Sequence, residues 1–349
     1  MALRLKLISV GLLAFLTIAG RSGATELLQA TGGPQALFSI QIGDQIQVGR
    51  IGEAMVTLEA PPGIDLYSLQ PIADGWVATG QELNNAGQSD LLLVRHSAGQ
   101  TEFLPLPERG PGKLRGQPVP LVASGILNGL AWVEGNQQSD LQVWASSWNG
   151  SDWGDRESVS GPGPGSQLAL TGTVLEDQSW ILIWTRFDGD DDEIVYSRRV
   201  GAVWSDVERI HADNQVPDIT PTTVALGGGA LVAWSWFDGS DYRVNTGLFD
   251  GRRWILGNSI GDKGALFPTL IAVGGEAHLL FQTVVPETWT IFEIDSTAFL
   301  ERWTSTAKSG PLRPLVVLSP ENEIRLGWPV ESGRIDFSKS HVLTWEPHP

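Results

Sequence analysis

The sequence predicts an all-β protein built from repeated units. Three observations predict it: many turn residues, short segments of alternating polarity, and aromatic residues at a regular spacing. Its 349 residues include 41 glycines and 21 prolines, with 42% hydrophobic and 18% charged residues. This composition is too apolar for a disordered chain and too rich in turn formers for a helical bundle.

Charge and cysteine content exclude several functions. The formal net charge is -17, so nucleic acid and anionic membrane surfaces are repelled and are not expected as partners. The chain has no cysteine, which excludes disulfides, thiolate metal sites and cysteine nucleophiles.

Residues 1–24 have the pattern of a signal peptide. Basic residues precede an apolar run over 7–19, which is too short to span a membrane, and small residues follow. Ser22 and Ala24 occupy the −3 and −1 positions of a cleavage site, so the mature chain is expected to start at Thr25. We expect a protein exported to a bacterial periplasm or the extracellular space, with no membrane insertion after cleavage. An uncleaved N-terminal anchor is the alternative.

Aligned apolar segments reveal an internal repeat of 47 to 53 residues. One column of the alignment holds a large aromatic residue in five of six units. Its members are Thr79, Trp132, Trp184, Trp234, Phe281 and Trp328.

Two further columns support the same six units. In the first, a serine or threonine precedes a tryptophan by seven or eight positions: Ser146 and Trp153, Ser197 and Trp204, Thr246 and Trp254, Ser296 and Trp303, Ser338 and Trp345. Gly150, Gly201 and Gly251 lie between the members of three pairs, as a tight turn requires. The second column opens the first strand of a unit with Pro118, Thr171, Pro221, Pro268 or Pro314.

Four short strands per unit at this spacing are typical of β-propeller blades. The sequence therefore predicts a six-bladed β-propeller of four-stranded antiparallel blades over residues 64–349. The predicted blades span residues 64–110, 111–160, 161–212, 213–261, 262–308 and 309–349. Residues 25–63 contain further strand-like stretches and are expected to cap the propeller, close the ring or form a degenerate seventh blade.

The serine-to-tryptophan segments have a known counterpart. SSWNGSDW and SRRVGAVW resemble the Asp-box, S-x-D-x-G-x-x-W, of sialidase-like propellers, although Trp148 and Arg199 replace its aspartate. In that family the box is a turn between the third and fourth strands, remote from the active site. The resemblance therefore implies the fold and not catalysis.

The catalytic pattern of the family is not visible. A sialidase-like enzyme would have an Arg-Ile-Pro element, whereas Arg50 and Ile51 are followed by Gly52, and a tyrosine nucleophile, whereas Tyr196 occupies an ordinary third-strand position. The histidines show no metal-ligand spacing. We expect a protein without the family's catalytic residues; if it is an enzyme, it is glycosidase-like.

Two groups of residues are candidates for ligand binding. Most tryptophans belong to the repeat columns and are expected to pack blade against blade. Trp148, Trp236 and Trp289 are candidates for stacking on sugar rings, and Arg313 for pointing into the central channel.

Acidic residues gather in the segment FDGDDDE and partly again in FDGSD one unit later. Carboxylates this close repel one another unless solvent, arginine or a hard cation compensates, and the alternation resembles the opening of a calcium loop. A solvated hairpin turn is the alternative. The calcium hypothesis assigns Asp188, Asp190, Asp192, Asp238 and Asp241 as ligands.

These observations favour an exported noncatalytic propeller that binds a glycan or a protein partner through its loop face, since a rigid ring of loops suits recognition. A glycoside hydrolase or lyase on the same ring, with its acids hidden among 40 carboxylates, is one alternative. A periplasmic scaffold or assembly factor is the other.

Overall fold

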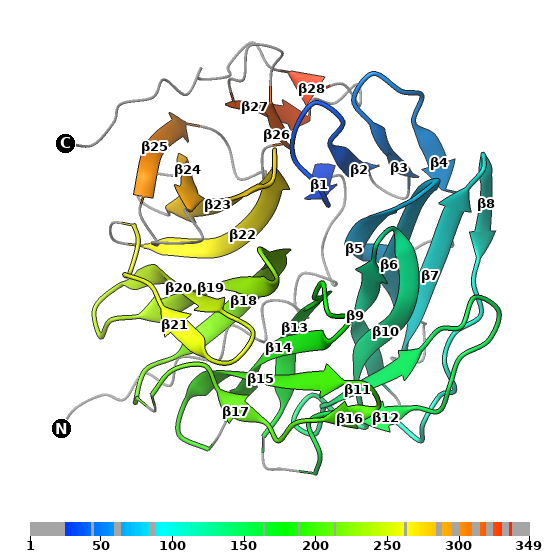
Figure 1. Cartoon of the computed structure of the whole chain (residues 1–349), viewed down its shortest axis with the longest axis horizontal. Helices are drawn as coiled ribbons and strands as arrows, with labels where there is room; N and C mark the ends of the chain where they lie inside the picture. Colours follow the sequence, from blue (N-terminus) through cyan, green and yellow to red (C-terminus); the bar gives the residue numbers. More distant parts are fainter. Residues whose placement is uncertain are drawn as a thin grey trace.

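A computed structural model describes residues 25–42, 45–58, 64–83, 88–112, 114–162, 165–187, 189–212, 214–261, 264–283, 288–294, 301–308, 315–318, 324–329 and 335–336. This part of the chain forms seven antiparallel sheets around a common axis, a β-propeller (Figure 1). All its regular elements are strands. Within these ranges, no helix has the length and apolar character to cross a membrane.

The sheets follow one another along the chain, and we number them from first to seventh. The first contains β1 (Thr25–Gln29), β2 (Leu37–Ile42), β3 (Gln45–Arg50) and β4 (Val56–Leu58). The second contains β5 (Ile64–Ile72), β6 (Gly75–Leu83), β7 (Ser89–Ser97) and β8 (Gln100–Phe103). The third contains β9 (Leu114–Ala123), β10 (Ile126–Gly135), β11 (Gln142–Ser147) and β12 (Glu157–Ser158).

The fourth sheet contains β13 (Gln167–Val174), β14 (Trp180–Phe187), β15 (Asp192–Val200), β16 (Val203–Trp204) and β17 (Glu208–Arg209). The fifth contains β18 (Asp218–Leu226), β19 (Gly229–Phe237), β20 (Tyr242–Phe249) and β21 (Trp254–Leu256). The sixth contains β22 (Ala265–Val273), β23 (Glu276–Thr283), β24 (Thr288–Ile294) and β25 (Glu301–Lys308). The seventh contains β26 (Leu315–Leu318), β27 (Ile324–Pro329) and β28 (Ile335–Asp336).

The described residues form seven sheets, which corresponds to the seven-bladed alternative among the expectations for residues 25–63. Residues 25–58 form a four-stranded sheet of their own, so the N-terminal segment is a member of the ring and not a cap over it. The other six sheets each lie within one of the predicted blade ranges. Residues 25–58 escaped the repeat alignment because they contain neither the aromatic column nor the serine-to-tryptophan spacing.

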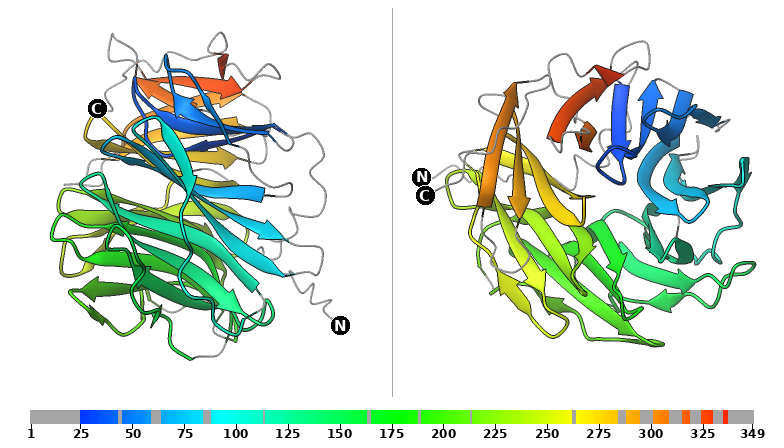
Figure 2. Two further views of the ribbon diagram at one scale, coloured as in Figure 1. Left: turned by 90° about the vertical axis from the view of Figure 1, so that its right-hand side faces the viewer. Right: turned by 45° about the horizontal axis from the view of Figure 1, so that its top comes forward.

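The first and seventh sheets lie side by side (Figure 2). The Gln29 amide joins them: its Nε2 donates to the carbonyl of Val316, and the backbone N–H of Val316 donates to its Oε1, both at 2.9 Å. A glutamine side chain thus takes the place of a strand neighbour at the point where the two ends of the ring meet.

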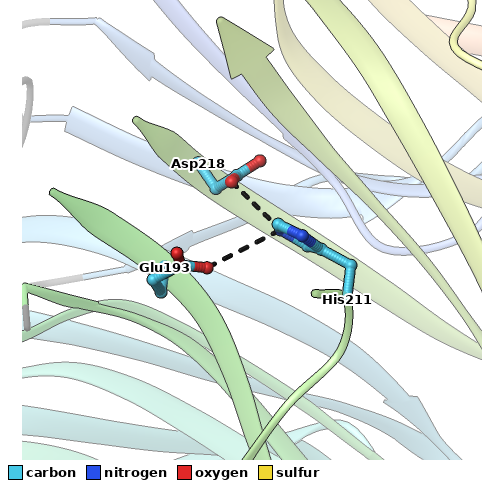
Figure 3. A group of neighbouring side chains, drawn as sticks. All are labelled: Glu193, His211 and Asp218. Atoms are coloured by element: carbon cyan, nitrogen blue, oxygen red, sulfur yellow. Dashed lines mark ion pairs between the residues drawn. The ribbon is translucent and has the colours of Figure 1, made fainter. Parts of the chain in front are cut away.

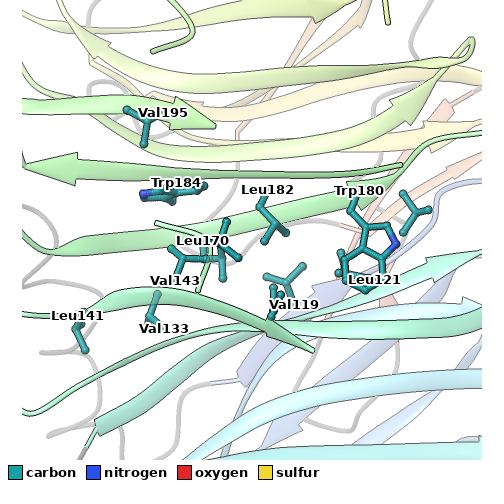
Figure 4. Packing of buried hydrophobic residues seen from close by; sticks show 14 residues of the cluster. Val119, Leu121, Val133, Leu141, Val143, Leu170, Trp180, Leu182, Trp184 and Val195 are labelled. Carbon is teal, nitrogen blue, oxygen red and sulfur yellow. The ribbon is translucent and has the colours of Figure 1, made fainter. Parts of the chain in front are cut away.

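The hydrophobic core lies between neighbouring sheets. Between the third and fourth, Val119 and Leu121 pack with Leu182 and Trp184 (Figure 4). Trp132, Trp184 and Trp234 are each at most 1% exposed. The packing role expected for this column is therefore confirmed.

The serine-to-tryptophan segments form turns after the third strand. The hydroxyls of Ser146 and Ser197 donate to the carbonyls of Gly154 and Ser205, at 2.8 and 2.9 Å. Gly150, Gly201 and Gly251 have φ of 104°, 62° and 92°, a region that favours glycine. The tryptophans reach back to the preceding sheet, since Trp153 Nε1 donates to the Pro105 carbonyl and Trp204 Nε1 to Glu157.

The first strand of several sheets contains a β-bulge at the proline column. Gln117, Ala169, Thr220 and Phe267 have φ between 51° and 55°, and the pairing register shifts there. Pro118, Pro221 and Pro268 directly follow these residues, so the proline column marks a bulge. In the fourth sheet Leu170, not Thr171, follows the bulged residue, which corrects the alignment by one position.

Candidate functional site

The polar side chains of interest gather at one end of the sheets. In the third to sixth sheets, the first strand begins where the second strand ends, as the antiparallel register requires. The bulges of the third and fourth sheets lie at the same level, because the backbone N–H of Leu170 donates to Gln117 Oε1 at 3.0 Å. We call this end of the third to sixth sheets the entry face.

Three tryptophans of the aromatic column donate to buried acceptors near the entry face. Trp132 Nε1 donates to Glu134 at 3.0 Å, Trp184 Nε1 to Gln167 at 2.5 Å, and Trp234 Nε1 to Asp218 at 2.7 Å. Gln167 and Asp218 are the first residues of β13 and β18. Pairing the indole N–H in this way offsets the cost of burying it.

In the third sheet, Arg115 on β9 and Glu134 on β10 form a buried ion pair at the same end of the strands. Arg115 is 1% exposed, and its Nε lies 3.4 Å from Glu134 Oε2 while its guanidinium lies over the Trp132 ring. Asp90 lies 3.3 Å away on the other side of the arginine. Burial lowers the pKa of Arg115, and the two carboxylates oppose this. This group holds opposite charges together within the protein.

Between the fourth and fifth sheets, three titratable side chains converge (Figure 3). Glu193 lies on β15, His211 on the loop between β17 and β18, and Asp218 at the start of β18. His211 Nε2 lies 3.0 Å from Asp218 Oδ2 and 3.8 Å from Glu193 Oε2. We call these three residues the carboxylate–histidine cluster.

Surrounding groups fix the orientation of the cluster. Asp218 accepts from Trp234 Nε1 at 2.7 Å and from Asn214 Nδ2 at 2.8 Å. The backbone N–H of Asn214 donates to Glu193 Oε1 at 3.3 Å. The His211 ring lies parallel to that of Trp234, with centroids 5.6 Å apart, and its Nδ1 lies 2.7 Å from the Ala212 carbonyl.

Burial changes the protonation of two members. It raises the pKa of Glu193 to about 7, although the amide of Asn214 and the charge of His211 favour the carboxylate. For His211, burial disfavours the charged form, but the neighbouring Asp218 carboxylate outweighs it and the pKa is raised. Both shifts favour the protonated forms of these two side chains.

The arrangement suits a small cation better than a large substrate. The side chains of Glu193 and Asp218 are 0% exposed and that of His211 is 12% exposed. A saccharide cannot reach a pair of carboxylates buried in this way. Among the described residues, these three form the group whose ligand atoms, all within 4.8 Å of one another, could hold a metal ion.

The predicted calcium ligands lie near this group but outside it. Asp188 lies outside the described residues, Asp190 is exposed, and Asp192 is buried at the start of β15. Asp238 caps its own turn by accepting from the backbone N–H groups of Ser240 and Asp241, and it pairs with Arg243 at 2.9 Å. The assignment of calcium to these five aspartates stays a prediction.

The predicted ligand-binding residues have different surroundings. Trp148 is 8% exposed and packs against Trp153, so little of its ring is free to stack on a sugar. Trp236 is partly buried directly opposite Asp218 in the β18–β19 pairing. Trp289 is placed on β24, with its side chain outside the description, and Arg313 lies outside the described residues.

Sequence reasoning missed His211 and Asp218, and it counted Glu193 only as part of the acidic run. His211 follows Glu193 by 18 residues and precedes Asp218 by seven, and no motif has this spacing. The chain brings them together because the connection from the outer strand of the fourth sheet to the first strand of the fifth crosses the entry face. In the sequence, the acidic run was thus the feature that pointed toward this cluster.

Comparisons with known proteins define the fold only. No family model and no curated protein sequence matches the chain. A puromycin-hydrolysing peptidase of Mycobacterium tuberculosis is similar at a TM-score of 0.54 and 12% identity, over 88% of this chain and 50% of the peptidase. The chain therefore spans about half the length of that protein.

One further solved structure, YjhT, has a similar fold, and a polysaccharide lyase is less similar. YjhT matches at a TM-score of 0.51 and 9% identity, over 82% of this chain and 97% of its own. An ulvan lyase of polysaccharide lyase family PL25 matches at 0.47 and 10% identity, over 73% of this chain and 75% of its own. At identities of 9–12% the similarity shows the fold alone, and the resemblance to Asp-box sialidases in particular stays a prediction.

Proposed function

We propose that this is an exported propeller that binds a neutral glycan on its entry face without chemically changing it. The observation that carries the proposal is the set of aromatic side chains left exposed at this end of the sheets. Phe187 and Phe267 are 40% and 38% exposed, and Trp236 is partly exposed between them. Aromatic rings offer broad apolar faces for sugar rings at low entropic cost.

Charge supports a neutral ligand. The chain has 40 acidic and 23 basic residues, so its field repels acidic polysaccharides. Burial supports binding without catalysis, because the carboxylates of Glu193 and Asp218 are closed to a sugar. The signal-like pattern of residues 1–24 supports export.

The test is binding of the purified protein to an array of neutral and acidic glycans, with reducing-end release measured on every glycan bound. We expect neutral glycans to bind and the Trp236→Ala and Phe187→Ala variants to bind them about tenfold more weakly, the equivalent of about 1.4 kcal/mol. Phe103→Ala, at a 52% exposed phenylalanine on the outer strand β8, is the matched control and should bind normally.

Three results would overturn the proposal. Release of new reducing ends would establish the glycoside hydrolase or lyase alternative. An array without neutral ligands would remove glycan binding and favour a protein partner or scaffold. Equal loss in the Phe103→Ala control would show that the loss does not come from the entry face.

A further inference from the structure

We propose that Glu193, His211 and Asp218 bind one first-row divalent metal ion, with zinc as the preferred ion. The inference is independent of the glycan proposal, because it concerns a buried group and is tested with metal alone. It rests on how three ligand atoms from three separate segments converge.

The spacing of these atoms matches a shared ion. Zinc lies about 2.0–2.2 Å from imidazole nitrogen and carboxylate oxygen, so two ligands of one ion are about 3.0–3.6 Å apart at octahedral or tetrahedral angles. His211 Nε2 lies 3.0 Å from Asp218 Oδ2 and 3.8 Å from Glu193 Oε2. Small side-chain shifts would give three protein ligands and leave a fourth position for water.

An unsatisfied atom provides the second observation. Glu193 is 0% exposed, yet its Oε2 accepts no hydrogen bond, and the nearest cationic nitrogens, His211 Nε2 and Arg209 Nε, lie 3.8 and 3.9 Å from it. Buried polar atoms are normally hydrogen-bonded, because leaving one without a partner costs free energy. This oxygen points toward His211 (Figure 3), where a shared ion would satisfy it.

The surroundings have the features of a second coordination shell. A metal-binding histidine usually donates its other ring N–H to a carbonyl or carboxylate, and His211 Nδ1 lies 2.7 Å from the Ala212 carbonyl. Trp234 and Asn214 hold Asp218, and the Asn214 amide holds Glu193. These contacts leave Glu193 Oε2 for the ion, and His211 Nε2 would exchange its contact with Asp218 for a shared ion.

The donor set selects among metals. Calcium takes six to eight oxygen ligands, whereas imidazole favours zinc and its first-row neighbours. Arg209 Nε lies 3.9 Å from Glu193 Oε2, and its positive charge would repel a bound cation. The carboxylate of Asp191, which is 8% exposed and interacts with Glu193, offsets that repulsion. Because the ligands come from β15, the β17–β18 loop and β18, the ion would join the fourth sheet to the fifth.

The experiment treats untagged purified protein with a chelator, adds Zn²⁺, Mn²⁺ or Ca²⁺, removes free ion and measures the metal per chain by mass spectrometry. We expect one zinc per chain and no retained calcium, with a higher melting temperature in zinc by mass action. With Co²⁺ as a probe, we expect visible d–d absorption from the bound ion. A protein that retains no zinc, manganese or cobalt overturns the proposal.

Substitutions of the three proposed ligands test where the ion binds. His211→Gln, Glu193→Gln and Asp218→Asn should each lower zinc affinity at least about 100-fold and abolish the Co²⁺ absorption. His96→Gln, at a histidine stacked on Trp76 in the second sheet, and Asp250→Asn, at an exposed turn, should bind zinc normally. If ligand variants fail to fold, Asn214→Ala provides the test, with weaker zinc binding expected. Unchanged zinc binding in a folded His211→Gln protein would contradict the assignment.

Discussion

Trp234 and Asp218 form a buried hydrogen bond of 2.7 Å, in which the indole N–H is the donor and the carboxylate is its acceptor. In the sixth sheet the tryptophan position holds Phe281, which has no N–H, and the first residue of β22 is Ala265, which has no acceptor. In the fourth sheet Trp184 again has a polar partner, Gln167. In the fourth, fifth and sixth sheets, the first residue of the first strand thus suits the aromatic side chain of the second strand. A polar residue accompanies tryptophan, and alanine accompanies phenylalanine.

This matching predicts a coupled pair of substitutions at Trp184 and Gln167. Trp184→Phe removes the donor to Gln167, and Gln167→Ala leaves the buried indole N–H without an acceptor, so each should destabilise by about 1–3 kcal/mol beyond any loss of packing. The double variant, which copies the chemistry of Phe281 and Ala265, should be less destabilised than the sum of the two. Urea unfolding of the wild type, the two single variants and the double variant measures these free energies. Strictly additive losses would show that the hydrogen bond does not couple the two residues.

The amide of Gln29 should be important for the closed ring. Gln29→Ala removes both hydrogen bonds to Val316 and leaves that backbone group without its partner, so we expect a loss of about 1–3 kcal/mol. Faster amide hydrogen exchange should be confined at first to the first and seventh sheets. Gln100→Ala, at an exposed position on the outer strand β8, is the control and should change stability little. Uniform exchange around the ring would contradict a closure role.

The sequence predicted the ring better than its closure. The aromatic column repeats because five of the sheets pack a large aromatic side chain at this position, and such a repeat is visible in one sequence. The first sheet buries smaller residues instead, such as Leu37 and Val48, and its link to the last sheet rests on Gln29. A single polar side chain that pairs across 287 positions leaves no periodic signal.

The site was predicted less well than the fold. The acidic run drew attention to the loop before β15, but the cluster takes Glu193 from its end and adds His211 and Asp218 from a connection between sheets. Local patterns cannot reveal this, since the contact depends on where that connection crosses the ring. The surroundings of Trp148 were hidden from the sequence for a related reason, because its exposure of 8% depends on the contact with Trp153 across the turn.

Backbone strain at the bulges can be relieved by glycine. Ala169 has φ of 51°, where a non-glycine residue costs of order 1 kcal/mol. Ala169→Gly should therefore leave stability equal or higher by up to about 0.5 kcal/mol, because relief of strain offsets the greater freedom of the unfolded chain. The control is Ala225→Gly, at an exposed position in regular strand β18, which should destabilise by about 0.5–1 kcal/mol. Equal losses in the two variants would show that the bulge is not strained.

The turn at Asp238 should make a pH-dependent contribution to stability. The backbone N–H groups of Asp241 and Ser240, together with Arg243, hold the pKa of Asp238 below the usual aspartate value. A carboxylate with a lower pKa in the folded state stabilises fully above its unfolded pKa, near 4, and loses that effect as the pH falls through the folded value. Asp238→Asn keeps an acceptor for the turn but loses the charge.

We therefore expect wild type to be more stable than the Asp238→Asn variant at pH 7, with the difference shrinking as the pH falls below about 4. Urea unfolding across this range measures the difference, and NMR titration of the Asp238 carboxyl checks its pKa directly. Because Arg243 supplies the opposite charge at 2.9 Å, Arg243→Gln should raise that pKa toward the usual value. A pKa unchanged by this substitution would assign the shift to the two backbone N–H groups alone.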